Sequence, residues 1–461
     1  MRYKFVCVSL AMMSLPGIMG LGGCKKFLNK VPDINKAGPE TVADFRSMLD
    51  DNSLFVNSTP GLGILATDDL NVDYTTWSRE NMVSQGAYVW DPVIYQQGFI
   101  SASWANPYAA INVCNQVLDG MDKLKIVDNP TRMEFNAVYG TALFYRAFFY
   151  YHLEETYGQP YKPGVATSLS GVPLRLTTDA LQKAGRSTVE GVYSQILKDL
   201  TKCLSYLPAG VQPHHNRPGL PAALALLARV YLARQDYSNA LYWSDSCLRT
   251  YDTLLDYNTV KKNSRPFPDD TNPEIIFQCS ANDYLAYYSG SILADSALYD
   301  SYDTNDLRKT LFFQKTPSGK GVIFKGNYTG GLYFFSGIAV DEVLLIRAES
   351  NAQIGAVAEA LDDLDRLRFH RWKTGTFYPL SAPTADSVLR LVLQEKRKET
   401  LFRELRWFDL RRLNQDSRFA HTLKRTLGSI EYTLPPNDLR YTFLIPASEI
   451  ELSGIDQNPT P

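Results

Sequence analysis

The sequence PAALALLARVYLARQDYSNALYWSDSCLRT, residues 221–250, decides the fold because it has the pattern of two short helices joined by a tight turn. Small and aromatic residues recur in it at offsets 0, 3, 9, 12 and 19, at Ala228, Tyr231, Tyr237, Ala240 and Cys247. Small residues at such spacings let two antiparallel helices cross closely. The stretch therefore predicts a helical hairpin.

A second, more degenerate copy of this pattern lies in the C-terminal third of the chain. Its positions, at offsets 0, 3, 7, 9, 12 and 19, are Ala348, Asn351, Gly355, Val357, Ala360 and Leu367. Tetratricopeptide repeats have small and aromatic residues at the offsets that the two stretches share. Any Ala-rich antiparallel hairpin gives part of the pattern, so the two copies suggest this repeat without proving it.

Other segments have helical or strand patterns that are separated by long irregular stretches. Apolar periodicity predicts further helices at 41–49, 95–124, 131–157, 187–207 and 387–413. Short apolar runs predict strands at 172–174, 275–277, 322–324 and 332–334. We therefore expect a mainly α fold, a tetratricopeptide-like helical scaffold with a few short β-strands and large loop-rich insertions near 50–92 and 251–337. Insertions of this size on a rigid scaffold usually carry function.

The composition excludes several classes of protein. The 47 basic and 49 acidic side chains give a formal net charge of −2, which provides no general attraction to nucleic acid. Hydrophobic residues make up 45% and charged residues 21%, which is typical of packed globular protein rather than disorder. The 28 tyrosines are the unusual feature, because tyrosine packs in cores but also contacts sugars and peptides at wet surfaces.

The first residues predict export and a lipid anchor. A basic start and an uncharged segment lead to Leu21-Gly22-Gly23-Cys24, which resembles the lipobox of bacterial lipoproteins. Acyl chains on Cys24 would tie the chain to a membrane. The expected organisation is a signal peptide at 1–23, a lipidated tether at 24–40 and one domain at 41–461. An ordinary secretory signal with a chance cysteine is the alternative.

Cysteine and histidine spacings predict neither a disulfide framework nor a metal centre. The four cysteines beyond the N-terminal segment lie in apolar stretches and are expected to be buried free thiols: Cys114, Cys203, Cys247 and Cys279. No cofactor is expected, although a divalent ion bracing an Asp-rich loop at Asp68-Asp69 stays open.

Two clusters of aromatic residues in irregular segments are the candidate ligand contacts. A pyranose presents C–H groups on one face and hydroxyls at its edge, so aromatic rings beside carboxylates, amides or arginine suit sugar binding. The candidate residues of the two clusters are Asp68, Asp69, Tyr74, Trp77, Arg79, Trp90, Tyr287 and Tyr288. Trp77 is the strongest, because Thr, Ser and Arg flank it. Core packing is the competing interpretation for any single aromatic residue here.

With these pieces placed, the chain resembles the SusD/RagB family of cell-surface nutrient-binding lipoproteins. The resemblance rests on an ordered series of motifs over nearly the whole chain. After the lipobox come KFLNKVP at 26–32, INVCNQVLD at 111–119, ALFYRAFFYY at 142–151, LLIRAE at 344–349, ELRWFDLRR at 404–412 and FLIPASEI at 443–450. No ligand motif carries over residue by residue.

The resemblance implies binding rather than catalysis, so the chain is not expected to be an enzyme. It implies a lipid-anchored protein on the outer face of the outer membrane that caps a SusC-like TonB-dependent transporter. Such a protein captures oligosaccharides or, in some branches, peptides and passes them to the transporter. Nucleic acid is not an expected partner.

Two alternatives of other classes stay open. A surface glycosidase would need paired carboxylates, and the helix expected at 387–413 carries several, among them Glu395, Glu399, Glu404 and Asp409. Because arginines alternate with them at helical spacing, ion pairs are the easier explanation. A scaffold protein that holds protein partners in tetratricopeptide-like grooves is the second alternative.

Overall fold

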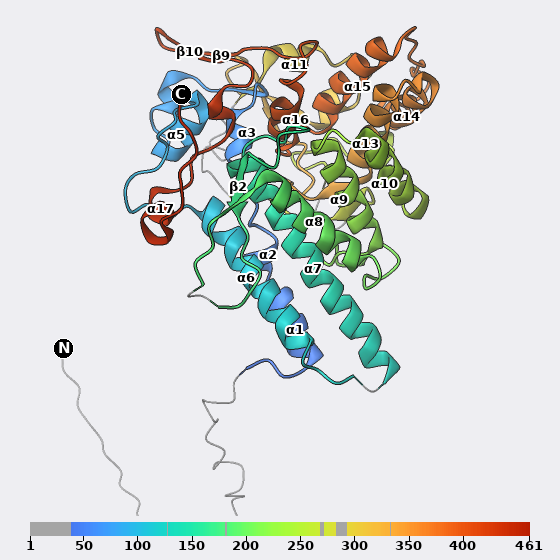
Figure 1. The fold of residues 1–461 in the computed structure, drawn as a ribbon. Helices are drawn as coiled ribbons and strands as arrows, with labels where there is room; N and C mark the ends of the chain where they lie inside the picture. The colour runs from blue at the N-terminus through green and yellow to red at the C-terminus, as the bar shows by residue number, and fades with distance from the viewer. Residues whose placement is uncertain (1–37, 127, 180–181, 268–271, 283–292, 332) are drawn as a thin grey trace, which may run out of the picture. The chain divides into compact units, whose positions relative to one another are not determined.

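Helices account for most of the regular structure in this computed structural model, which describes residues 38–126, 128–179, 182–267, 272–282, 293–331 and 333–461 (Figure 1). The described α-helices are α1 Val42–Leu49, α2 Asn52–Phe55, α3 Leu62–Ala66, α4 Tyr74–Trp77, α5 Met82–Val89, α6 Ala102–Met121, α7 Asn129–Tyr157, α8 Val189–Cys203, α9 Leu220–Ala233, α10 Tyr237–Thr250, α11 Ser296–Asp300, α12 Arg308–Leu311, α13 Val340–Gln353, α14 Val357–Arg371, α15 Ala385–Glu399, α16 Leu405–Leu413 and α17 Ala447–Ser453. The prediction of a mainly α fold is confirmed.

The described strands are short and form five antiparallel pairs. The pairs are β1 Leu70–Asn71 with β5 Leu293–Ala294, β2 Ser170–Pro173 with β3 Arg186–Thr188, β4 Ile275–Phe277 with β8 Ile338–Ala339, β6 Phe313–Lys315 with β7 Val322–Phe324, and β9 Leu423–Leu427 with β10 Ile430–Leu434. Three of these pairs involve the insertion at 251–337. The β1–β5 and β4–β8 pairs connect it to other parts of the chain, and the β6–β7 pair lies within it. The strands therefore fasten the insertions rather than build a sheet core.

Helix α7 is the central element of the main hydrophobic core. Its N-cap, Asp128, accepts a hydrogen bond from the Thr131 N–H, and the helix is buried continuously from Val138 to Tyr157. α6 and α8 pack against it, as Figure 1 shows. A helix that is apolar on every face must be covered on every face. The prediction of a buried helix at 131–157 is confirmed.

The two repeat-like stretches form helical hairpins that stack on each other. α9 pairs with α10, α13 pairs with α14, and α10 packs against α13. Ala228 and Ala240 are fully buried in one small cluster with Leu232 and Ile346, so the first hairpin contacts the second through its small residues. The insertion that separates the hairpins in sequence does not separate them in space. The tetratricopeptide-like scaffold is confirmed.

Several predicted element boundaries were wrong. The segment 50–92 is not simply irregular, because it contains α2, α3, α4 and α5. The helix expected at 387–413 is broken at 400–404, where Phe402 and Glu404 have positive φ. The helix expected at 95–124 starts only at Ala102, and the chain after α16 contains the β9–β10 hairpin and α17. Tyr333 and Phe334 form no strand, and Leu332 lies outside the described residues.

Other predictions about local structure held. The helix predicted at 41–49 is confirmed as α1, which Thr41 caps in a reciprocal capping box with Asp44 and which buries Val42, Phe45 and Leu49. The four cysteines of the described chain are buried and free. Of the helices in the described ranges, none has the length and apolar character to cross a bilayer.

Candidate functional site

Helix α4 presents an aromatic pair on the surface of the described chain. Tyr74 is 54% exposed, and its ring centroid lies 5.8 Å from that of Trp77, with the two planes tilted by 40°. The indole N–H of Trp77 donates to the Gln85 carbonyl at 3.0 Å, which fixes the orientation of the half-buried ring. The pair is therefore a rigid, partly open apolar surface.

Local sequence explains why so short a helix forms. Asp73 is its N-cap: the carboxylate accepts from the N–H of Thr76 at 3.0 Å and from its hydroxyl at 3.0 Å. These bonds hold the pKa of Asp73 below its usual value, chiefly through the Thr76 N–H. Arg79 and Asn81, both exposed, follow directly and supply polar groups next to the rings. The arrangement suits a ligand that has both apolar and hydroxyl-bearing faces.

Two ion-paired aspartates anchor the segment that carries α4. Asp68 pairs with Arg406 at 2.8 Å and with Arg397 at 3.3 Å, and Asp69 pairs with Arg397 at 2.8 Å. Burial opposes ionisation of Asp68, but Arg406 and Arg397 outweigh it and hold its pKa well below the usual range. Burial dominates at Asp69, whose pKa is raised. Because the two carboxylates already have arginine partners, they position the segment rather than offer free ligand contacts.

The remaining predicted site residues fall in different environments. Trp90 is only 3% exposed and its indole N–H donates to the Ala66 carbonyl at 2.8 Å, so it is a core residue and not a surface contact. Tyr287 and Tyr288 lie outside the described residues. The flank that follows them is described: β5 pairs with β1, and the Asp295 N–H donates to the Asp69 carbonyl at 2.8 Å. The structure thus brings the end of the second insertion to the start of the α4 segment.

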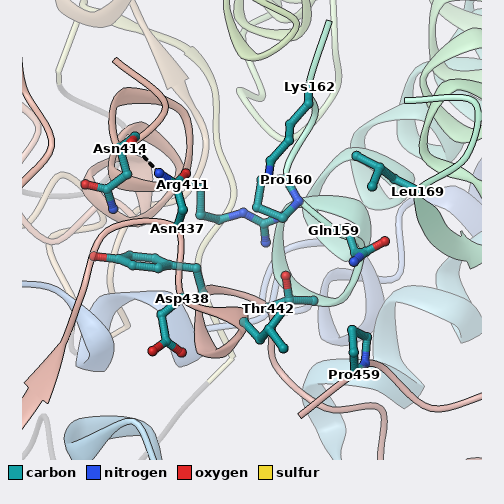
Figure 2. Close-up of a pocket in the computed structure, with 12 residues that line it drawn as sticks. Gln159, Pro160, Lys162, Leu169, Arg411, Asn414, Asn437, Asp438, Thr442 and Pro459 are labelled. Atoms are coloured by element: carbon teal, nitrogen blue, oxygen red, sulfur yellow. Dashed lines mark hydrogen bonds between the residues drawn. The ribbon is translucent and has the colours of Figure 1, made fainter. Parts of the chain in front are cut away.

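The hollow in Figure 2 is small and has both polar and apolar residues in its lining. It lies beside Gln159 and Pro160, which follow α7, and beside Arg411 and Asn414 at the end of α16. Its volume is ≈ 50 Å³, whereas pockets for drug-sized ligands usually measure about 300–1,000 Å³. The hollow has room for a molecule the size of water but not for a sugar ring.

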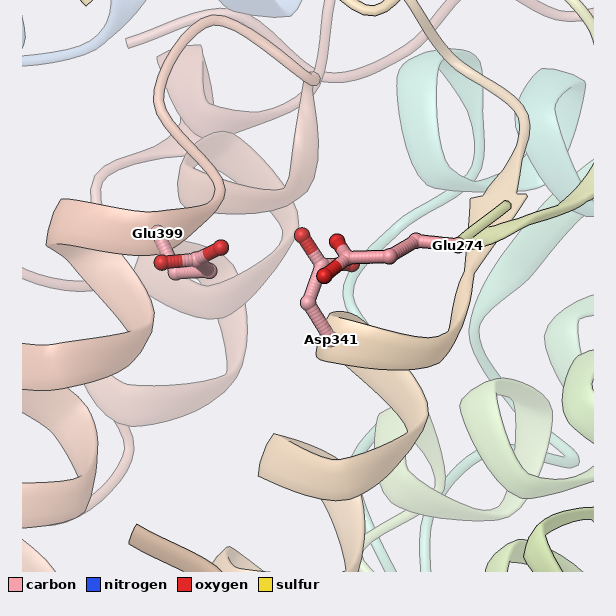
Figure 3. A group of neighbouring side chains, drawn as sticks. All are labelled: Glu274, Asp341 and Glu399. Atoms are coloured by element: carbon pink, nitrogen blue, oxygen red, sulfur yellow. The ribbon is translucent and has the colours of Figure 1, made fainter. Parts of the chain in front are cut away.

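Three buried carboxylates, Glu274, Asp341 and Glu399, converge from different elements in Figure 3, and their nearest oxygens lie within 4.8 Å of one another. Arginines neutralise them: Arg371 contacts Glu274 at 2.8 Å and Glu399 at 2.7 Å, and Arg403 contacts Asp341 at 2.9 Å. Burial raises the pKa of Asp341 to about 7, whereas arginines overcome burial and lower that of Glu399 to about 2. The cluster is the centre of an ion-pair network.

The other acids expected for a glycosidase are also wholly or largely buried, and each already has a partner. Glu395 pairs with Arg308 at 2.6 Å, Asp409 pairs with Lys396 at 2.9 Å, and Glu404 contacts His152 at 3.1 Å. A glycosidase needs two carboxylates on opposite sides of an accessible scissile bond. None of the candidate acids on α15, on α16 or in the turn between them meets this requirement. Ion pairing is therefore the correct interpretation of the alternating charges.

Family comparisons agree with this fold. The family model described as starch-binding and associating with the outer membrane matches residues 26–232, and the model of the SusD family matches residues 340–459. A "SusD-like protein" of Formosa agariphila is 26% identical over 377 residues, which cover 68% of this chain and 72% of the relative. The helical hairpin scaffold with its looped insertions is thus that of a SusD-like protein.

Solved structures give the same fold. A SusD superfamily protein of Bacteroides thetaiotaomicron matches with a TM-score of 0.73 and 21% identity, over 91% of this chain and 100% of the other. A putative sugar binding protein of Bacteroides vulgatus matches with a TM-score of 0.72 and 21% identity, over 91% of this chain and 99% of the other. The chain belongs to the SusD/RagB family.

Proposed function

We propose that this protein binds an oligosaccharide at the surface formed by Tyr74, Trp77 and Arg79 and delivers it to a SusC-like TonB-dependent transporter. The observation that carries the proposal is the aromatic pair on α4, in which the exposed Tyr74 lies beside a half-buried Trp77 that the hydrogen bond to Gln85 holds in place. A rigid aromatic surface loses little conformational entropy when a sugar face stacks on it. The family match to starch-binding proteins associated with the outer membrane supports the same function.

The proposed role is capture without chemistry. The protein would be lipid-anchored through Cys24 and face the cell exterior, where it would hold the glycan above the transporter. A peptide is the other ligand class that the family resemblance allows. The carboxylates that might have supported hydrolysis are buried in ion pairs, so binding is the function that the accessible side chains support best.

The test is binding of the purified chain to a glycan array and a peptide pool, followed by calorimetry on the strongest ligand. Trp77→Ala and Tyr74→Ala are expected to weaken the affinity about tenfold each, since a stacked ring contributes on the order of 1–2 kcal/mol. Tyr378→Ala is the matched control, because Tyr378 has the same 54% exposure but lies far along the chain, after α14. Equal affinities in all three variants would show that the binding site is not on α4.

A further inference from the structure

A groove on the stacked hairpins has the chemistry of a second binding site. It lies between α10, α13 and α14, which are adjacent in Figure 1, and its volume is ≈ 560 Å³. That volume is within the range of ligand sites, about 300–1,000 Å³. Its lining comes from the two repeat-like hairpins and from neither aromatic cluster of the proposed glycan surface.

The charge of this groove is negative because its acids outnumber its base. Arg347 is already engaged, at 2.6 Å from Asp363 and at 3.1 Å from Asp245. Glu359 and Asp362 also line the groove, one helical turn apart on exposed positions of α14. Neither has a cationic partner within the described ranges of the chain. Two unpaired carboxylates in a groove attract a cationic ligand.

Asn351 gives an independent sign of a ligand. The residue is 6% exposed and its side chain lines the groove, yet its amide has no hydrogen-bond partner among the residues that the structure describes. The donors and the acceptor of this amide are therefore open to a molecule in the groove. The Asn351 amide offers one acceptor and two donors, which can pair with the N–H and the C=O of a peptide unit in an extended chain.

Tyr242 completes the site. Its ring is 57% exposed and lines the groove from α10, whereas the two unpaired carboxylates line it from α14. An exposed aromatic ring beside carboxylates attracts an ammonium or guanidinium group by cation–π interaction as well as by charge. A neutral sugar would use the ring but would leave the two carboxylates without a counter-charge.

We propose that this groove binds an extended peptide segment that carries lysine or arginine. The carboxylates of Glu359 and Asp362 receive its basic side chains, the Asn351 amide pairs with its main chain, and Tyr242 packs on a basic or apolar side chain. The proposal goes beyond glycan capture and does not depend on it, because the two sites share no residue.

The test is fluorescence anisotropy of a labelled hexapeptide of alternating alanine and lysine with blocked ends, titrated with the full chain. The same peptide with glutamate in place of lysine is the ligand control. Asp362→Lys is expected to weaken binding of the lysine peptide about tenfold, because it replaces an attraction by a repulsion. Glu431→Lys is the matched variant: it makes the same charge change at an exposed position of β10, outside the groove.

Asn351→Leu keeps the side-chain volume but removes the amide. We expect it to weaken binding of the lysine peptide about fivefold while its circular dichroism spectrum stays that of the folded protein. Tighter binding of the blocked peptide than of one with free ends would identify an internal segment of a partner protein as the ligand, and the reverse would identify a free peptide. Equal binding of the lysine and glutamate peptides would overturn the proposal, as would equal affinities in Asp362→Lys and Glu431→Lys. Glycan binding measured in the same variants tests the α4 surface separately.

Discussion

Glu154 shows how a single buried carboxyl group can make the stability of the fold depend on pH. It lies in the core on α7, where one carboxyl oxygen accepts from the Val172 N–H at 2.9 Å. Burial raises its pKa to about 8, against the opposing effects of that hydrogen bond and of Arg411. At neutral pH the folded protein therefore holds a neutral carboxylic acid at this position.

Replacement of Glu154 by Gln tests this protonation state. Because the folded pKa is above the unfolded value, the contribution of the group to stability is complete below about pH 4.5 and is lost as the pH rises to about 8. The loss is about 1.4 kcal/mol per pH unit at most. The free energies of unfolding of Glu154→Gln and of the natural protein should therefore be similar at pH 5 and should diverge toward pH 8, with the variant the more stable.

Urea unfolding at a series of pH values measures the difference. Glu134→Gln is a suitable control, since it removes a half-exposed carboxylate from the same helix. Parallel stability curves for Glu154→Gln and the natural protein from pH 5 to pH 8 would show that Glu154 is ionised in the core, and the interpretation would then be wrong.

At the scale of elements, the contact between α1 and α6 depends on a glycine. A Cβ atom on Gly120 of α6 would overlap the Phe45 ring of α1, which is buried. Gly120→Ala should therefore lower the free energy of unfolding by about 1–3 kcal/mol, although alanine is the better helix former.

A double-mutant cycle separates steric overlap from helix propensity. If the overlap with Phe45 is the cause, Gly120→Ala should cost clearly less in a Phe45→Leu background, where the smaller side chain leaves room for the new methyl group. Thermal or chemical unfolding of the four proteins gives the coupling energy. A cost that is the same in both backgrounds would contradict the steric explanation.

The elements also show which parts of the fold the sequence could predict. The helix at 131–157 and both hairpins follow from apolar patterns that persist over several turns, so their prediction held. The break between α15 and α16 has no such signal, because residues 395–406 are mostly helix-favouring. It exists because Arg403 is buried against Asp341, a residue distant in sequence, and because Phe402 and Glu404 adopt positive φ. Tertiary contacts override propensity at this position.

The same limit applies to the candidate site. Trp77, which Thr, Ser and Arg flank, is half-buried, whereas Trp90, which follows Ala-Tyr-Val, is buried at the end of α5 with φ of 58°. In short helices few residues define a buried face, so periodicity cannot separate core from surface. The arginine partners of Asp68 and Asp69 lie more than 300 residues away, and a single sequence contains no signal that pairs them.

At the scale of the whole molecule, a buried ion network joins the 251–337 insertion to the stacked hairpins. Arg371, at the end of α14, contacts Glu274 in the insertion and Glu399 at the end of α15, and it donates to the Leu255 carbonyl at 3.0 Å. The Tyr257 ring covers its guanidinium group at 4.0 Å. The network fixes the loop-rich insertion on the helical scaffold, and removal of one member leaves a buried charge without a partner.

Arg371→Met should therefore destabilise the protein by about 3–5 kcal/mol at pH 7. Arg366→Met is the control on the same helix, because Arg366 contacts the carboxylate and the carbonyl of Asp252 at the surface, and its loss should cost at most about 1 kcal/mol. With Arg371 in place, the pKa of Glu399 is about 2, so its contribution to stability is present above about pH 4.5 and is lost as the pH falls toward 2.

Without Arg371, Glu399 keeps Arg308 at 2.7 Å but loses the charge that lowers its pKa most, so its folded pKa should rise from about 2. The destabilisation caused by Arg371→Met should therefore be smallest at the acid end of the range and should grow as the pH rises from about 2. Chemical unfolding across this range measures it. A difference that does not change with pH would mean that Arg371 stabilises the fold by packing on Tyr257 rather than by charge, and that the insertion is attached to the scaffold mainly by apolar contacts.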